Sequence, residues 1–198
     1  MSISAQEVKE LRDRSGVGMM DCKKALIEAN GDIDKAFEVL RKNGIAKAQK
    51  KAGRDAKEGS VVSYIHPGAK LGVLLELNCE TDFVANTDDF KDLANDICMH
   101  IAATAPISVR SEDVDSSIVD KEKEIYIDQA KKSGKPDEII EKMVDGRLKK
   151  FFQENVLLEQ NFVKDPSKTI TDLITDKVSV LGENIVINSF SRFQIGEK

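Results

Sequence analysis

Along the first 45 residues, apolar positions recur at the spacing of three short amphipathic helices. The first helix follows Ser4, which forms a capping-box pattern with Glu7 and is followed by Val8 and Leu11 on one face. The two others carry apolar residues at i, i+3, i+4 and i+7: Cys22, Ala25, Leu26 and Ala29, then Ile33, Ala36, Phe37 and Leu40. Asn30-Gly31 and Asn43-Gly44 are expected to end these helices, because both residue types tolerate the left-handed conformation. The pattern predicts a compact three-helix bundle.

Residues 60–79 change to the alternation that is typical of β-strands. Two apolar runs flank Pro67-Gly68-Ala69-Lys70, which predicts a hairpin. One face of the second run carries Leu71, Val73, Leu75 and Leu77. A strongly amphipathic helix is expected to begin at Thr87 or Asp88 and to cover one face of the sheet. Its apolar positions are Phe90, Leu93, Ala94, Ile97, Cys98 and Ile101.

Residues 117–152 predict two charged helices with thin apolar stripes, joined at Ser133-Gly134-Lys135-Pro136. Such a pair should fold back as an antiparallel hairpin, and its thin stripes favour a protruding coiled coil. Residues 169–182 predict a last helix, and residues 183–196 predict a closing strand. The expected fold class is α+β, with a three-helix domain and basic linker at 1–55. An α+β core with an antiparallel sheet and the helical hairpin follows at 56–198.

The charge balance supports a boundary near residue 55. Residues 1–55 hold 12 Lys and Arg against 9 Asp and Glu, whereas the remaining chain holds 18 against 26. The basic segment 41–57 is interpreted as a helical or flexible linker, for which a solvated connector is favoured over RNA contact. The net charge of −5 argues against a general nucleic-acid-binding protein, so no direct nucleic-acid partner is expected.

Membrane association and catalysis find little support in the sequence. No apolar run is long enough to span a bilayer and no signal sequence is visible, so no membrane partner is expected. Three cysteines without CxxC spacing favour a reducing cytoplasm over a disulfide framework or a zinc site. His66 and His100 stand far apart, Cys79 is interpreted as a core residue, and nucleotide-binding motifs are absent. We therefore expect no enzyme activity, no catalytic residue, no metal and no cofactor.

Two short stretches suggest contact surfaces instead. The stretch Gly16-Val17-Gly18-Met19-Met20 lies between the first two helices and presents both methionines on a loop, with Arg12 and Lys23 on either side. Methionine adapts its shape to a partner, and we expect one of the two to be buried and the other to be partly exposed. The second stretch, "ELNCETDFVAN" at residues 76–86, places Phe83 beside a carboxylate after a strand. From spacing alone, the ring could cap the sheet edge and Asp82 could cap a turn, or the pair could enter a partner.

These two stretches resemble a known family. "LRDRSGVGMMDCKKAL" (residues 11–26) and "ELNCETDFVAN" are similar to the two signature stretches of elongation factor Ts, the guanine-nucleotide exchange factor of bacterial-type translation. The segments "EANGDIDKAFEVLRKNG", "IHPGAKLGV" and "SGKPDEIIEKMVDGRLKKFFQE" extend the resemblance over essentially the whole chain.

The resemblance implies a role for each stretch. Residues 1–55 would form a ubiquitin-associated-like domain that docks on the nucleotide-binding domain of elongation factor Tu. The docking surface would include Arg12, Met19, Met20 and Lys23, and His66 would be a further contact. The second stretch would supply Thr81, Asp82, Phe83 and Val84. With Phe83 as a wedge, it would enter the partner near its Mg²⁺ site and promote release of GDP.

The chain departs from the family pattern at two points. Ser15 stands where threonine is usual, which keeps the hydroxyl group. The core holds one hairpin-plus-helix unit where longer members have two related halves, so a homodimer is expected to supply the second. The rival hypothesis is an adaptor, in which residues 1–45 bind a peptide or a nascent chain and the core is unrelated. Deleting the core would then leave the affinity intact.

Overall fold

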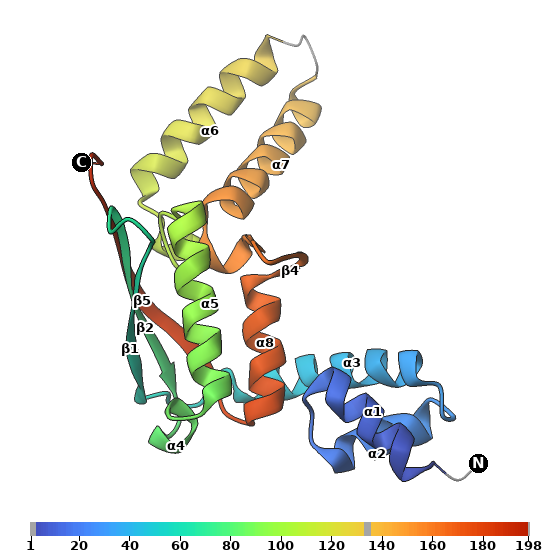
Figure 1. Cartoon of the computed structure of the whole chain (residues 1–198). Coiled ribbons are helices and arrows are strands. Elements are labelled where there is room, and N and C mark those ends of the chain that lie inside the picture. The colour runs from blue at the N-terminus through green and yellow to red at the C-terminus, as the bar shows by residue number, and fades with distance from the viewer. Residues whose placement is uncertain (1–2, 133–135, 198) are drawn as a thin grey trace. The chain divides into compact units, whose positions relative to one another are not determined.

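The computed structural model describes residues 3–132 and 136–197, and its N-terminal part is the expected set of three helices (Figure 1). These are α1 (Ala5–Ser15), α2 (Met19–Glu28) and α3 (Ile33–Lys51). The capping box of α1 is confirmed, since the Ser4 N–H donates to the Glu7 carboxylate at 2.7 Å and the Glu7 N–H donates to Ser4 Oγ at 3.2 Å. The helices share one apolar cluster, whose buried members are Val8, Leu11, Val17, Cys22, Ala25, Leu26, Ala29, Ala36 and Leu40.

The expected ends of α2 and α3 have different outcomes. Asn30 and Gly31 have φ angles of 53° and 86°, so the left-handed end after α2 is confirmed. The prediction that α3 stops at Asn43-Gly44 is wrong, because this helix continues to Lys51. A Cβ at Gly44 would lie 3.1 Å from Ser179 Oγ of α8 (Ile170–Leu181). The glycine therefore permits the close approach of two helices and does not end one.

The central sheet has three strands in the order β1-β2-β5. The strands are β1 (Glu58–Ile65), β2 (Leu71–Cys79) and β5 (Ile185–Gln194). The predicted hairpin is confirmed, and its turn is closed by the His66 N–H, which donates to Leu71 O at 2.9 Å. Helix α5 (Asp88–Thr104) buries all six of its predicted apolar positions. Cys98 Sγ of α5 contacts Val62 O at 3.9 Å, so this helix lies against the sheet.

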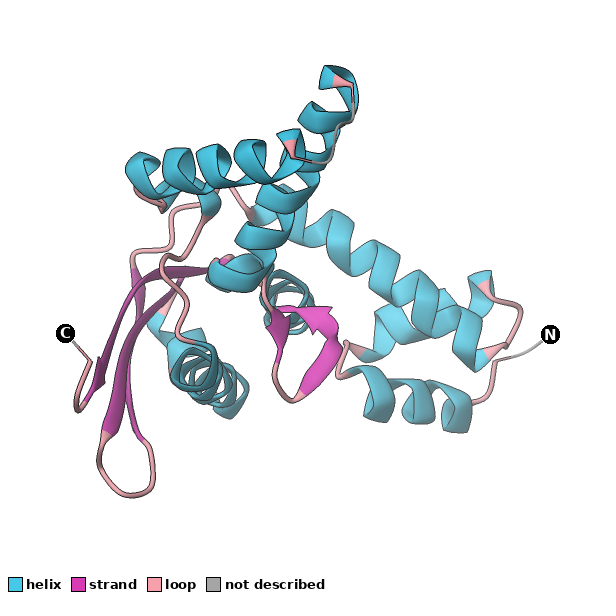
Figure 2. Cartoon of the chain, turned by 90° about the horizontal axis from the view of Figure 1, so that it is seen from above, coloured by secondary structure: helices cyan, strands magenta, loops and turns pink. Residues whose placement is uncertain are grey.

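The remaining elements complete an α+β fold, as predicted. Helices α6 (Ser116–Lys131) and α7 (Asp137–Asn155) pack on each other through Ala130, Ile140 and Val144. Three residues of the expected connection, 133–135, lie outside the described residues. Short elements that the sequence pattern did not predict are α4 (Asp82–Ala85), the 3-10 turns η1 (Ser111–Asp113) and η2 (Leu157–Glu159), and the strands β3 (Asn161–Phe162) and β4 (Asp165–Thr169). The last two form a separate two-stranded sheet (Figure 2).

By its internal contacts the chain divides into two compact units, each assembled from three segments. The first unit comprises the residues up to Val61, Glu76–Ala94 and Asp172–Ile187. The second comprises Val62–Leu75, Asn95–Thr171 and the residues from Asn188 on. The division into domains at residue 55 stays a prediction.

Candidate functional site

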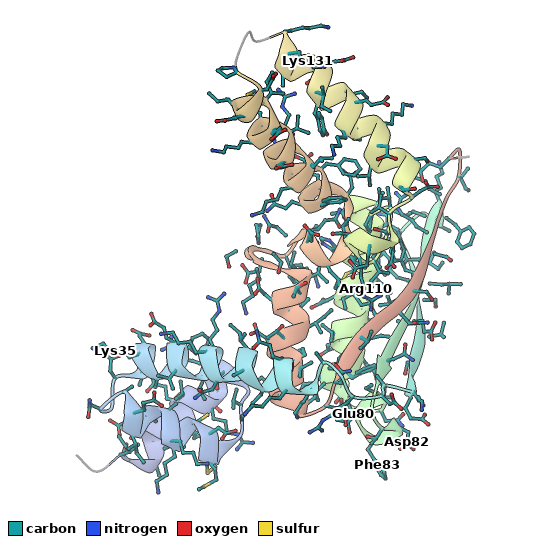
Figure 3. The ribbon with its side chains drawn as sticks, turned by 180° about the vertical axis from the view of Figure 1, so that it is seen from behind. Lys35, Glu80, Asp82, Phe83, Arg110 and Lys131 are labelled. Atoms are coloured by element: carbon teal, nitrogen blue, oxygen red, sulfur yellow. The ribbon has the colours of Figure 1, made fainter. Side chains whose placement is uncertain are left out.

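The stretch that follows β2 forms an exposed tip, which we define as residues Thr81–Val84. Thr81 is the N-cap of the one-turn helix α4, and its side chain accepts from the Val84 N–H at 3.5 Å. Phe83 is 82% exposed, and in Figure 3 its side chain points away from the ribbon. The alternative in which Phe83 caps the sheet edge and Asp82 caps the turn is therefore wrong. Thr81 makes the cap, and the ring of Phe83 is left largely exposed.

The base of the tip is held by Glu183, in the turn between α8 and β5. Its Oε2 accepts hydrogen bonds from the N–H groups of Glu80 and Thr81, at 3.1 and 3.0 Å. Its Oε1 accepts from the Thr81 hydroxyl at 2.7 Å. Charge-assisted bonds of this kind are about twice as strong as neutral ones. One carboxylate thus holds the backbone and the side chain at the start of the tip.

A second carboxylate, that of Glu80, joins the same two segments. Glu80 Oε1 accepts from the Asn184 N–H at 2.7 Å, and Glu80 Oε2 pairs with Arg54 at 3.4 Å. The bond from the Asn184 N–H and the positive charge of Arg54 lower the pKa of the Glu80 carboxyl. The Asn184 side chain donates to Arg54 O at 2.8 Å. The segment at residues 80–81 and the segment at residues 183–184 are therefore joined in both directions. The glutamate carboxylate of each segment accepts hydrogen bonds from backbone N–H groups of the other.

A second exposed surface lies on α2. Met19 and Met20 are 54% and 67% exposed, so the expectation that one of them is buried is wrong. Both belong to the first turn of α2 and not to the loop where they were expected, and Val17 of that loop is buried. The predicted neighbours Arg12 and Lys23 are also exposed.

Ile27 belongs to the same surface and was missed from the sequence. It is 57% exposed and follows Met20 and Lys23 at seven- and four-residue spacing, so the three share one face of α2. The apolar spacing at i, i+3 and i+4 in α2 predicts only the buried face of this helix, and a single exposed isoleucine on the other face adds no comparable pattern. The surface of α2 and the tip both belong to the first unit.

His66 lies in the second unit, in the turn between β1 and β2, and is exposed. Its Nδ1 lies 3.0 Å from the hydroxyl of Tyr64, and the two rings are 6.1 Å apart. The imidazole therefore lies at the surface of the hairpin.

Two side chains that could carry reactive chemistry, Cys79 and His100, are buried. Burial raises the pKa of the Cys79 thiol, aided by the negative charge of Glu183, and its Sγ donates to Thr81 O at 3.1 Å. His100 is fully buried and bonds to Gln160 Oε1 at 3.0 Å. Among the described residues, no group of three His, Cys, Asp or Glu side chains is placed to hold a metal ion. The helices of the described ranges are all too short or too polar to cross a membrane.

Comparison with known proteins agrees with the family resemblance of the sequence. A family model described as "Elongation factor TS" matches residues 21–197. The chain is 60% identical over 197 residues to elongation factor Ts of Fervidobacterium nodosum, covering 100% of both chains. It is 57% identical over 195 residues to elongation factor Ts of Caldanaerobacter subterraneus subsp. tengcongensis, covering 98% of each. With elongation factor Ts of Carboxydothermus hydrogenoformans the identity is 58%, over 98% of this chain and 90% of the relative. The chain belongs to the elongation factor Ts family.

Proposed function

We propose that this protein is a guanine-nucleotide exchange factor for elongation factor Tu and promotes GDP release by inserting Asp82 and Phe83 near the partner's Mg²⁺ site. The observation that carries the proposal is the 82% exposure of Phe83 on a segment whose base is tied down by Glu183. A large exposed ring on a tethered support is suited to enter a pocket with little loss of conformational entropy.

The physical basis is differential binding. Burying a phenylalanine side chain fully contributes about 1.5–3 kcal/mol. If the pocket for Phe83 exists only in the nucleotide-free partner, this free energy favours that state over the GDP-bound state. Displacement of Mg²⁺ removes charge compensation from the GDP phosphates, which weakens nucleotide binding further. No bond is made or broken, so the protein acts without catalytic residues or a cofactor of its own.

The surface on α2 serves as the docking site for the nucleotide-binding domain of the partner. Met19 and Met20 supply adaptable apolar contacts, Ile27 extends them, and Arg12 and Lys23 supply positive charge at the rim. The docked domain, residues 1–55, holds the factor on its partner while the tip acts. The complex needs neither membrane nor nucleic acid, and it assembles in the cytoplasm.

We further propose a homodimer through the second unit. In this unit Ile65, Leu74, Phe193 and Ile195 are exposed and line one hollow. Contiguous exposed apolar side chains of this kind mark interaction surfaces. A second copy covering them would give the short chain the two core halves that longer members carry.

The direct test is release of fluorescently labelled GDP from elongation factor Tu, followed after excess unlabelled GDP and the factor are added. Phe83→Ala should slow the stimulated release by well over tenfold while the circular dichroism spectrum is retained. Ile118→Ala, which truncates an exposed apolar side chain on α6, is the matched control and should match the wild type. Release by Phe83→Ala at the wild-type rate would eliminate the wedge mechanism.

A further inference from the structure

The tip needs an external support to keep a defined direction. Helix α4 has four residues, whereas isolated helices shorter than about 12 residues are marginal in water. Phe83 is too exposed for packing within its own chain to orient its ring. The direction of the ring is therefore set by the backbone of residues 81–84 and by whatever holds that backbone.

Glu183 is placed to provide this support. It is separated from Glu80 and Thr81 by 103 and 102 positions in the sequence, so its bonds join two distant segments. All three of its bonds go to the two residues that immediately precede α4. Gly182, with φ of +79°, makes the turn that presents this carboxylate, and its carbonyl oxygen accepts from Lys51 Nζ.

The Thr81 hydroxyl links Glu183 to the helix itself. Because this hydroxyl donates its proton to Glu183 Oε1, its lone pairs remain to accept from the Val84 N–H. Without the carboxylate, the hydroxyl is free to rotate and the cap of α4 loses its fixed geometry. The loss of a cap destabilises a helix, and a helix of one turn is marginal without it.

We infer that Glu183 is a positioning residue for nucleotide exchange: its carboxylate orients Thr81 and, through it, the direction in which Phe83 is presented. The effect of Glu183 on GDP release rests on the proposed function, whereas its hydrogen bonds to the base of the tip do not depend on that function. Glu183 touches neither the partner nor the nucleotide in this scheme, so its effect on exchange passes entirely through the tip.

A measurement without the partner tests the geometry. In the full chain, Glu183→Gln should make the amides of Thr81 and Val84 exchange with deuterium at least about tenfold faster. The amides of the buried part of α5 should keep their wild-type protection. Glu183→Ala is a second variant with the same expectation. Unchanged exchange at Thr81 and Val84 in both variants would overturn the inference, whatever the activity.

A kinetic measurement tests the consequence. GDP release from elongation factor Tu is followed at increasing factor concentration to separate the maximal rate from the half-saturating concentration. Glu183→Gln should lower the maximal rate about tenfold, as expected for one charge-assisted hydrogen bond, with half-saturation within about twofold of the wild type. Asp89→Asn is the matched control, since it removes a carboxylate of the same unit that pairs with Lys177 and does not touch the tip.

The double variant Phe83→Ala/Glu183→Gln separates positioning from a general structural effect. If Glu183 acts through Phe83, the double variant should release GDP no more slowly than Phe83→Ala alone. The inference is overturned if the double variant slows GDP release by the product of the factors of the two single variants. It is also overturned if Glu183→Gln releases GDP at the wild-type rate. A wild-type rate for Phe83→Ala overturns the proposed function instead, and the amide measurement then still decides whether Glu183 holds the tip.

Discussion

Ser179 of α8 lies directly against Gly44 of α3, with its Oγ and Cβ 3.1 and 3.2 Å from the position that a Cβ of residue 44 would occupy. These distances are shorter than ordinary van der Waals contact, so the two helix backbones are as close as the missing side chain allows. The contact explains why α3 carries a glycine in its interior, where glycine is unfavourable by about 1 kcal/mol relative to alanine.

Gly44→Ala should lower the free energy of unfolding by about 1 kcal/mol, because overpacking costs about 1–3 kcal/mol and exceeds the gain in helix propensity. Urea unfolding of the full chain, followed by circular dichroism, measures the change. In a Ser179→Gly background the same substitution should stabilise. Gly146→Ala on α7 is the control: with no atom within 4 Å of the added Cβ, it should stabilise by about 1 kcal/mol.

The surface on α2 should control affinity for elongation factor Tu, and the tip should control the rate. Met20→Ala combined with Ile27→Ala is expected to raise the half-saturating factor concentration by about tenfold or more, since two apolar contacts of about 1 kcal/mol each are lost. The maximal rate of GDP release should stay within about twofold. Ile139→Ala, another exposed apolar truncation, on α7, should change neither quantity. A fall in maximal rate at unchanged half-saturation would contradict the docking role.

Stability should fall in mild acid because of His100. Burial lowers the pKa of this imidazole, whose Nδ1 accepts from the Val163 N–H at 3.3 Å. A base with a lowered pKa in the folded state contributes stability that is present above its unfolded pKa, about 6.5. That stability is lost as pH falls toward the folded pKa. The loss should approach about 1.4 kcal/mol per pH unit, the slope for one proton.

Urea unfolding at several pH values between 7 and 5 measures this slope. His100→Gln should remove the histidine contribution and flatten the profile. His66→Gln, which removes the exposed histidine, is the matched control. An identical slope for His100→Gln and the wild type would show that other groups carry the pH dependence.

The proposed homodimer should depend on the exposed apolar side chains that line the hollow of the second unit. Phe193, which is 66% exposed, would be buried between the two copies, so Phe193→Glu would place a charge in an apolar interface. Light scattering at micromolar concentration should give twice 21.9 kDa for the wild type and 21.9 kDa for the variant. Val163→Glu, at another exposed apolar position, should remain dimeric. A monomeric wild type with full exchange activity would refute the dimer.

Several helices and turns could be predicted from the local sequence, because the spacing of apolar residues indicates which face of an element is buried. The face of α5 from Phe90 to Ile101 repeats with the helical period, and all six of its apolar positions are buried. The capping box at Ser4 and the hairpin around Gly68 are equally local, since each depends on residues a few positions apart. For such elements the sequence alone predicted the structure, including Ser4 as the N-cap of α1.

Other features depend on residues distant in sequence and were decided only by the tertiary structure. By its local sequence Gly44 is typical of a helix end, but in the structure it lies against Ser179 inside α3. Met19 and Met20 are exposed because Val17 enters the core in their place. The chemistry of Phe83 beside Asp82 was evident from the sequence, and its exposure was not. No spacing rule connects Glu183 to a tip about a hundred residues earlier, because long-range carboxylate-to-backbone bonds leave no periodic trace in the sequence.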